Sequence, residues 1–202
     1  MRPYPPEIVI EPYVGIDYFI PAPELDHFVR TTFLDCLSEL YNEEHAHLGK
    51  AHLGWLWTNV PYVKQMRVVA GQAEKPMFKG GAWQKHRQEM QFEEWFGGIP
   101  DFVITLDARY ANEASDRDFC ALLEHELYHC AQRRNKDGAP KFHEDTDRPV
   151  YGMRGHDVEE FVGVVRRYGM SQSVRDLVEA ATDDDGRVEA ADITLLCGNC
   201  GK

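Results

Sequence analysis

One pentapeptide carries the clearest chemistry in the sequence: His125-Glu126-Leu127-Tyr128-His129, an H-E-x-x-H pattern. Residues four apart lie on the same face of a helix, so the two imidazoles can bind one metal ion together. The glutamate beside the first histidine can reach a metal-activated water and accept its proton. The pattern therefore predicts a zinc site at which Glu126 is the general base.

A third ligand must come from downstream, because a catalytic zinc ion ordinarily has three protein ligands and one open position. The compact extension of the motif requires glycine at position 132 and histidine at position 135. The chain has Gln132 and Asn135 there, which excludes that pattern.

The next histidines along the chain are His143 and His156. We favour His156, which follows Gly155 at the predicted start of a helix and can be aimed at the first helix. Glu160 or Glu159, in the first turn of that helix, is the alternative third ligand, and His143 is a further one. Tyr128, Tyr151 and Arg154 are candidates for stabilising the oxyanion, and no spacing rule selects one of them.

These residues resemble a known family. The helix ALLEHELYHCAQ and the later stretch GMRGHDVEEFVGVVRRYG resemble the phage-type zinc metallopeptidase domain, which is itself similar to SprT-like zincin proteases. In SprT-like proteins the third ligand is a histidine in a Gly-His segment that ends in an aromatic residue, and Gly155-His156 through Phe161 matches that segment. The resemblance lies mainly within residues 100–168 and implies a zinc peptidase of the zincin type.

The chain departs from the SprT-like pattern in two ways. The loop from His129 to His156 is longer, and residues 157–160 are more acidic. Both departures keep Glu159 and Glu160 open as ligands.

The elements that must position the motif can be read from local signals. Ser115 followed by Asp118 predicts a capping box that opens a helix through residues 119–134. The β-branched run at 99–111 predicts an edge strand just before this helix, where a protease would bind its substrate. The other expected elements are a strand-like lead-in at 1–22, a helix at 24–42, strands at 52–60 and 64–73, a helix or hairpin arm at 83–98, a loop at 139–155, and helices at 156–169 and 171–182.

Composition narrows the function classes. The 202 residues include 22 basic and 34 acidic ones, which gives a net charge of −12. This charge disfavours nucleic-acid partners, because lysine and arginine must neutralise the phosphates of a bound nucleic acid. No run of 18 apolar residues predicts a membrane span, and no secretory signal is visible. We therefore expect a cytoplasmic protein with reduced cysteines, located in the host cytoplasm if it is phage-encoded.

Cys197 and Cys200 form one Cys-x-x-Cys pair in the tail at 183–202. A closed structural zinc site needs four ligands, so this pair is half a site. It could be completed across a dimer or by Cys36, Cys120 or Cys130, or it could be an exposed thiol pair.

Together these features predict a single α+β domain spanning residues 1–202. The expected architecture is zincin-like: a small mixed or antiparallel sheet, an H-E-x-x-H helix and a facing helix that carries the third ligand. The expected activity is zinc-dependent hydrolysis of a peptide or protein substrate. The alternative is a catalytically silent zinc-binding module on the same fold.

Overall fold

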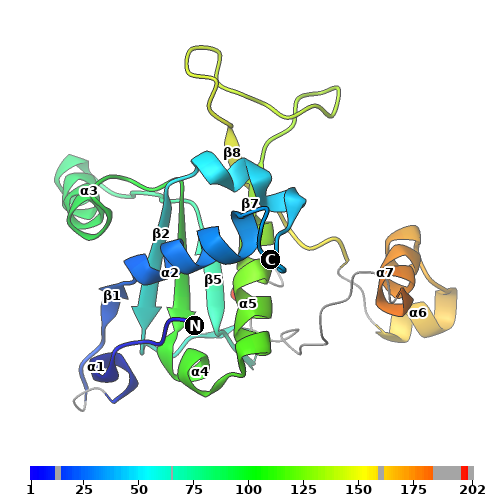
Figure 1. Ribbon diagram of the computed structural model, residues 1–202, viewed down its shortest axis with the longest axis horizontal. Helices are drawn as coiled ribbons and strands as arrows, with labels where there is room; N and C mark the ends of the chain where they lie inside the picture. The colour runs from blue at the N-terminus through cyan, green and yellow to red at the C-terminus, as the bar shows by residue number, and fades with distance from the viewer. Residues whose placement is uncertain (12–14, 65, 159–161, 184–196, 200–202) are drawn as a thin grey trace.

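The computed structural model describes residues 1–11, 15–64, 66–158, 162–183 and 197–199. Its centre is a four-stranded mixed sheet with the strand order β1-β2-β6-β5 (Figure 1). The strands are β1 (Phe19–Pro21), β2 (Leu53–Thr58), β5 (Gly71–Glu74) and β6 (Phe102–Asp107). β2 and β6 run parallel with Leu53 opposite Phe102, whereas β1 and β5 run antiparallel to their neighbours. The mixed α+β class is thus confirmed.

β6 lies inside the sheet, so the prediction that the run at 99–111 forms the edge strand is wrong. The edge beside the motif helix is β5 instead. The run is also shorter than predicted, because the Asp107 side chain accepts the Tyr110 N–H and starts α4 (Ala108–Glu113). An aspartate at this position favours a helix start over a continued strand.

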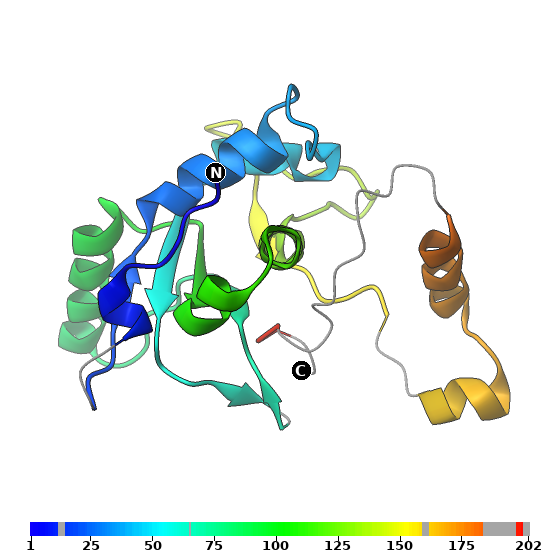
Figure 2. The ribbon, with the colours of Figure 1, turned by 60° about the horizontal axis from the view of Figure 1, so that its bottom comes forward.

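Helices α2 (Pro23–Val29) and α5 (Asp116–His129) cover one face of the sheet (Figures 1 and 2). Side chains alternate across each strand, so one set from β2 and β6 faces these helices. The largest fully buried side chains there are Trp55, Trp57, Phe33, Phe102, Phe119, Leu25, Leu48, Ile104, Leu106, Leu122, Leu123 and Leu127. The core therefore holds α5 at a fixed position and rotation against the sheet.

The opposite face receives α3 (Ala82–Phe96) at β2. A Cβ added at Gly54 would lie 3.0 Å from the Phe96 ring, so glycine permits this close approach. α3 also settles the interpretation of 83–98, which is a helix and not a hairpin arm.

The helix predicted at 24–42 is too long. α2 continues into a π-helical turn at Arg30–Leu34 and ends at Asp35. The Asp35 carboxylate accepts the Leu37 N–H, and Ser38 Oγ accepts the Leu40 N–H. These local hydrogen bonds replace helical ones, and Leu37 is 90% exposed despite its place in the apolar pattern.

The motif helix ends at His129 and not near 134, because Cys130 leaves the helical conformation. β7 (Cys130–Gln132) then pairs antiparallel with β8 (Tyr151–Met153), with Cys130 opposite Met153. The segment predicted as a loop at 139–155 therefore contains the second arm of a hairpin.

The remaining elements are short. The lead-in contains a helical turn, α1 (Glu7–Ile10), where a strand-like run was predicted, and a 3-10 helix spans Glu43–Lys50. The strand predicted at 64–73 is divided among β3 (Val63–Lys64), β4 (Arg67–Val68) and β5.

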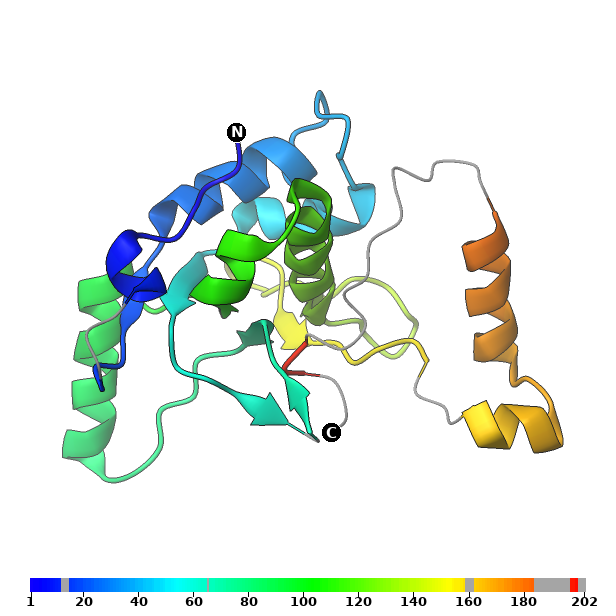
Figure 3. The same ribbon diagram turned by 90° about the horizontal axis from the view of Figure 1, so that it is seen from below.

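Two helices follow the β7–β8 hairpin in the chain. α7 (Gln172–Thr182) matches its prediction and begins at the Ser171 cap, whereas α6 (Val162–Tyr168) is shorter than the predicted 156–169. Both lie to one side of the sheet, and neither buries a residue (Figures 1 and 3). No helix in the described ranges is long and apolar enough to cross a membrane.

Candidate metal centre

Four potential metal ligands meet near the C-terminal end of α5. They are His125, His129, His156 and Cys197, and their ligand atoms all lie within 4.8 Å of one another. Imidazole nitrogen and thiolate sulfur are donors that zinc and similar ions bind, and four of them suit tetrahedral coordination. The residues present therefore fit a bound metal ion.

The first two histidines are positioned by α5. Ser115 caps this helix by accepting the Asp118 N–H at 3.1 Å, as its sequence predicts. His125 and His129 are one turn apart, with ring centroids separated by 5.0 Å. Burial of Leu122, Leu123 and Leu127 on the sheet side of α5 fixes the rotation that aims both rings at the centre.

His156 reaches the centre from a loop and not from a helix, which corrects the predicted facing ligand helix. It follows β8, and its Nε2 lies 3.2 Å from Nε2 of His125. Burial, together with the neighbouring His129 and His156 imidazoles, lowers the pKa of His125 to about 4. His125 is therefore neutral at pH 7, which is the form that binds a metal.

The β7–β8 hairpin orients His129. Its Nδ1 donates a hydrogen bond to the carbonyl oxygen of Arg154 at 2.8 Å, because a carbonyl can only accept. The Arg154 N–H in turn donates to the carbonyl of His129 at 3.0 Å. This arrangement leaves His129 Nε2 as the acceptor atom, 3.2 Å from Cys197 Sγ. Such a partner fixes both the tautomer and the ring direction of a metal-binding histidine.

Glu126 is buried beside the same cluster. Its Oε2 accepts the N–H of Ala73 in β5 at 2.8 Å. Burial raises the pKa of Glu126 to about 7, and the Cys197 thiol and the Ala73 N–H counteract part of that rise. A carboxyl group with a pKa near neutrality can both accept and return a proton at pH 7.

Gly71 in β5 makes room for Glu126. A Cβ at this position would lie 3.0 Å from Glu126 Oε1 and 3.0 Å from Leu122 Cδ1. The absence of a side chain lets the edge strand pass directly over α5 at the carboxylate.

The segment Cys197–Asn199, which we call the C-terminal clip, lies along the free edge of β5. The Gly198 N–H donates to the Gly71 carbonyl at 2.7 Å, and Asn199 Nδ2 donates to the Ala73 carbonyl at 2.7 Å. In Figures 2 and 3 this red stretch lies near the yellow chain that follows β8. The clip thus brings Cys197 to the histidines.

Three of the cavities among the described residues bear on the site. One of 150 Å³ adjoins the metal residues and includes Tyr128 and Arg154 in its wall. A second, of 610 Å³, runs from β5 and Asn199 toward α3, past Phe92 and Trp95.

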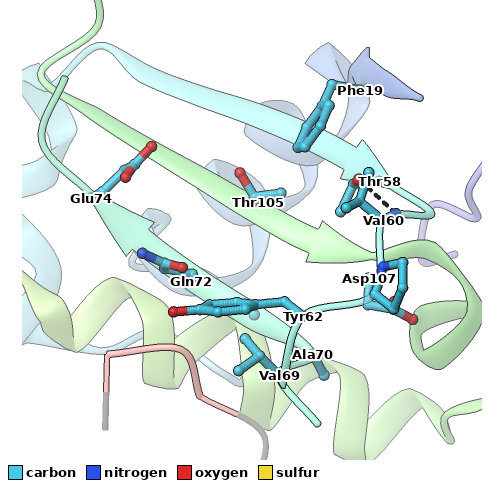
Figure 4. A pocket seen from close by; sticks show the side chains of 12 residues that line it. Phe19, Thr58, Val60, Tyr62, Val69, Ala70, Gln72, Glu74, Thr105 and Asp107 are labelled. Atoms are coloured by element: carbon cyan, nitrogen blue, oxygen red, sulfur yellow. Dashed lines mark hydrogen bonds between the residues drawn. The ribbon is translucent and has the colours of Figure 1, made fainter. Parts of the chain in front are cut away.

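The third cavity, of 280 Å³, lies on the sheet face opposite α5 (Figure 4). In that view Thr105, Gln72 and Glu74 lie on the near side of the strands, with the helices behind the sheet. The sheet therefore separates this cavity from Glu126.

The other predicted site residues are placed as follows. Tyr128 and Arg154 face the small cavity, whereas Tyr151 turns away and donates its hydroxyl to the His47 carbonyl at 3.2 Å. His143 lies in the exposed loop before β8. Glu159, Glu160 and Cys200 lie outside the described residues.

Cys197 was the residue that sequence reasoning failed to connect with the histidines. It lies 68 residues beyond His129, and no spacing rule relates positions so far apart. The available signal was the Cys-x-x-Cys pair itself, which indicated metal affinity without indicating the partner.

The comparisons with known proteins bear on the whole arrangement. Neither a curated protein nor a solved structure gives a significant match to the chain. A family model matches residues 26–182, which include the H-E-x-x-H helix and His156. The chain belongs to the family described as "Putative phage metallopeptidase".

Proposed function

We propose that this protein is a zinc-dependent peptidase with His125, His129 and His156 as metal ligands and Glu126 as the general base. The observation that carries the proposal is the placement of a buried carboxyl group, with a pKa of about 7, beside three converging imidazoles. A peptidase needs such a proton acceptor in addition to the metal ligands.

The residues divide the reaction between them. A bound zinc ion would polarise the scissile carbonyl and lower the pKa of a coordinated water. Glu126 accepts a proton from the attacking water and delivers it to the leaving amine. Arg154, in the wall of the small cavity and paired with Asp157 at 2.6 Å, would stabilise the developing oxyanion, whereas the Tyr128 hydroxyl accepts a hydrogen bond from Asn42. His129 keeps its orientation through the Arg154 carbonyl.

The substrate would bind as an extended peptide along β5. Edge strands bind peptides through main-chain hydrogen bonds, and the Gly71 carbonyl already accepts one from the Gly198 N–H, while the Ala73 carbonyl accepts the Asn199 side-chain amide. The 610 Å³ cavity continues from this edge and offers the aromatic rings of Phe92 and Trp95 to an apolar side chain.

The test combines metal content with hydrolysis. Purified protein is loaded with zinc, its stoichiometry is measured by mass spectrometry, and cleavage of a quenched fluorescent peptide library is followed. Because Cys197 lies among the imidazoles, the assay uses both the natural chain and Cys197→Ser. We expect one zinc per chain and hydrolysis that Glu126→Gln abolishes while zinc remains bound. Absence of bound zinc, or absence of cleavage in both backgrounds, would contradict the proposal.

A second candidate is a catalytically silent zinc-binding module. It is favoured by the thiol of Cys197, because three histidines and one cysteine can complete four-coordination and leave no open position. This candidate predicts one tightly bound zinc and no cleavage by the Cys197→Ser chain.

A further inference from the structure

We propose that Cys197 is the fourth metal ligand, so that the C-terminal clip closes the site by occupying the position of the catalytic water and of the substrate main chain. This inference concerns the regulation of the proposed peptidase site and rests on that function for its consequence. The metal coordination itself can be tested without any peptidase activity.

The position of the sulfur is the first support. Cys197 Sγ lies 3.2 Å from His129 Nε2, within the cluster whose ligand atoms are all within 4.8 Å of one another. Cys197 also pairs with Gly71, where an added Cβ would lie 3.0 Å from Glu126 Oε1. A group that lies next to both the imidazoles and the general base stands where the attacking water would be.

The backbone of the clip gives independent support. Gly71 and Cys197 form a parallel β-bridge, and the Gly198 N–H donates to the Gly71 carbonyl. The Asn199 side chain donates to the Ala73 carbonyl two residues further along β5. These are the edge-strand acceptors that an extended substrate would use, so the clip and a substrate cannot bind together.

The fit between clip and strand is close. A Cβ at Gly198 would lie 2.9 Å from Gln72 Cβ and 2.9 Å from Val69 Cγ1, closer than real Cβ atoms approach other atoms. Lys64 Nζ also donates to the Gly198 carbonyl, at 2.7 Å. Backbone hydrogen bonds of Gly198 therefore hold the clip against β5, and only glycine at position 198 permits this close contact.

Opening the site involves exchange of ligands without a redox step. The Cys197 thiolate would take a proton from one solvent water and leave its position, and the hydroxide from that same water would occupy the vacated position. The clip then separates from β5, which frees the Gly71 and Ala73 carbonyls for substrate. The atoms and charges balance with solvent water as the only co-reactant.

Coordination is tested with Co²⁺, which adopts the geometry of zinc and shows a near-ultraviolet charge-transfer band when a thiolate binds it. We expect this band in the natural chain and in Cys36→Ser, whose cysteine is exposed and outside the cluster. We expect Cys197→Ser to lose the band and to keep bound cobalt. A natural chain without the band, or a Cys197→Ser chain that retains it, overturns the inference.

Closure of the site is tested with acetohydroxamate, a small bidentate oxygen ligand for zinc, whose affinity is measured by titration calorimetry. A site that is open for only a small fraction of the time binds such a probe correspondingly more weakly. We expect Cys197→Ser to bind it about tenfold more tightly, or better, than the natural chain. Equal affinities would show that the thiol does not block the metal.

Gly198→Ala tests the clip without altering a ligand. The added Cβ must displace the clip from β5, so we expect a weaker charge-transfer band and tighter acetohydroxamate binding than in the natural chain. Gly49→Ala is the matched control, because a Cβ there meets nothing within 4 Å and Gly49 lies outside the cluster. Identical spectra and affinities for Gly198→Ala and the natural chain would contradict the docked clip.

The two proposals fail in different ways. If the cobalt and acetohydroxamate results hold but no variant cleaves peptides, Cys197 is a ligand of a silent module and the peptidase function is wrong. If Cys197→Ser and the natural chain cleave peptides at equal rates, the peptidase stands and closure by the clip is wrong.

Discussion

The residues of the metal centre are held in two different ways. His125 and His129 depend on the regular spacing of α5, whereas His156 depends on the loop after β8. The hairpin that supplies this loop also supplies the Arg154 carbonyl that orients His129. His156 is therefore the proposed ligand whose contribution most needs a direct measurement.

His156→Ala should weaken zinc binding strongly, while His143→Ala should leave it unchanged. His156 belongs to the cluster, whereas His143 lies in an exposed loop. Because both histidines follow the motif helix in the chain, comparing the two variants distinguishes a proposed ligand from a histidine outside the cluster. We expect the loss to exceed the roughly 100-fold that removal of an orienting partner can cause. Competition against a fluorescent chelator measures both affinities. Equal losses in the two variants would remove His156 from the ligand set.

Glu126 should make the metal-free protein less stable as the pH rises. Its pKa is about 7 in the folded protein against 4.5 for an ordinary glutamate, so the folded state binds the additional proton. The contribution of Glu126 to the free energy of unfolding is then fully present below about pH 4.5. It is lost as the pH rises through 7, by up to about 3 kcal/mol.

Glu126→Gln lacks this ionisation and serves as the reference. We expect its free energy of unfolding in urea to exceed that of the natural chain by more at pH 8 than at pH 5. Both proteins are measured with a chelator present, because a bound metal changes the charge near the carboxyl group. If the free energies of unfolding of the two proteins changed with pH in parallel, burial would not disfavour the ionised form of Glu126.

At the scale of single residues, the sequence predicted which nearby residues lie together in the candidate site and missed the distant Cys197. His125, Glu126 and His129 were predictable because a helical repeat brings them together within five residues. His156 was favoured from a Gly-His segment, although the predicted helix around it is a loop. Cys197 could not be placed, because its position depends on pairing with β5 across more than 120 residues.

Among the elements, β5 matters most to the site, because it contacts both Glu126, the proposed general base, and the clip. Gly71 lies over Glu126, accepts from Gly198 and has no side chain that could prevent either contact. The rate of hydrolysis should therefore be sensitive to this position.

Gly71→Ala should reduce hydrolysis in the Cys197→Ser background without removing zinc. The new Cβ would lie 3.0 Å from Glu126 Oε1, so the carboxylate must shift, and a small displacement of a catalytic group can cost about 100-fold. Gly49→Ala is the control, since a Cβ there meets nothing within 4 Å. Peptide cleavage rates and zinc content measure the effect. Unchanged cleavage by Gly71→Ala would mean that Glu126 tolerates displacement.

The errors at this scale share a physical cause. The predicted helices at 24–42 and 119–134 both extend past the ends of the helices in the structure, because the apolar periodicity continues after each helix has ended. Asp35 and Ser38 end the first through side-chain hydrogen bonds, and the pairing of β7 with β8 ends the second. Such pairing is a tertiary effect that local patterns do not contain.

For the whole molecule, bound metal should act as a cross-link between distant parts of the chain. The proposed ligands come from α5, from the loop after β8 and from the clip. Zinc at a free concentration 1,000 times its dissociation constant should add about 4 kcal/mol to the free energy of unfolding. For a chain of this size, that corresponds to a rise in Tm of roughly 10 °C.

Differential scanning calorimetry of zinc-loaded and chelator-treated protein measures this difference. His156→Ala should show a smaller rise, and His143→Ala should show the full rise. A Tm that is indifferent to the chelator would mean that the cluster does not hold a metal in the folded protein.

Because the clip belongs to the same chain as β5, it competes with substrate as a tethered ligand. The effective concentration of the clip at the edge of β5 would be around a millimolar or lower, whatever the concentration of protein. A free peptide at about a micromolar would then need an intrinsic affinity for this edge roughly a thousandfold higher than that of the clip to occupy it half of the time. Diluting the protein would therefore never free the edge of β5, and weakly binding peptides would be excluded even when abundant.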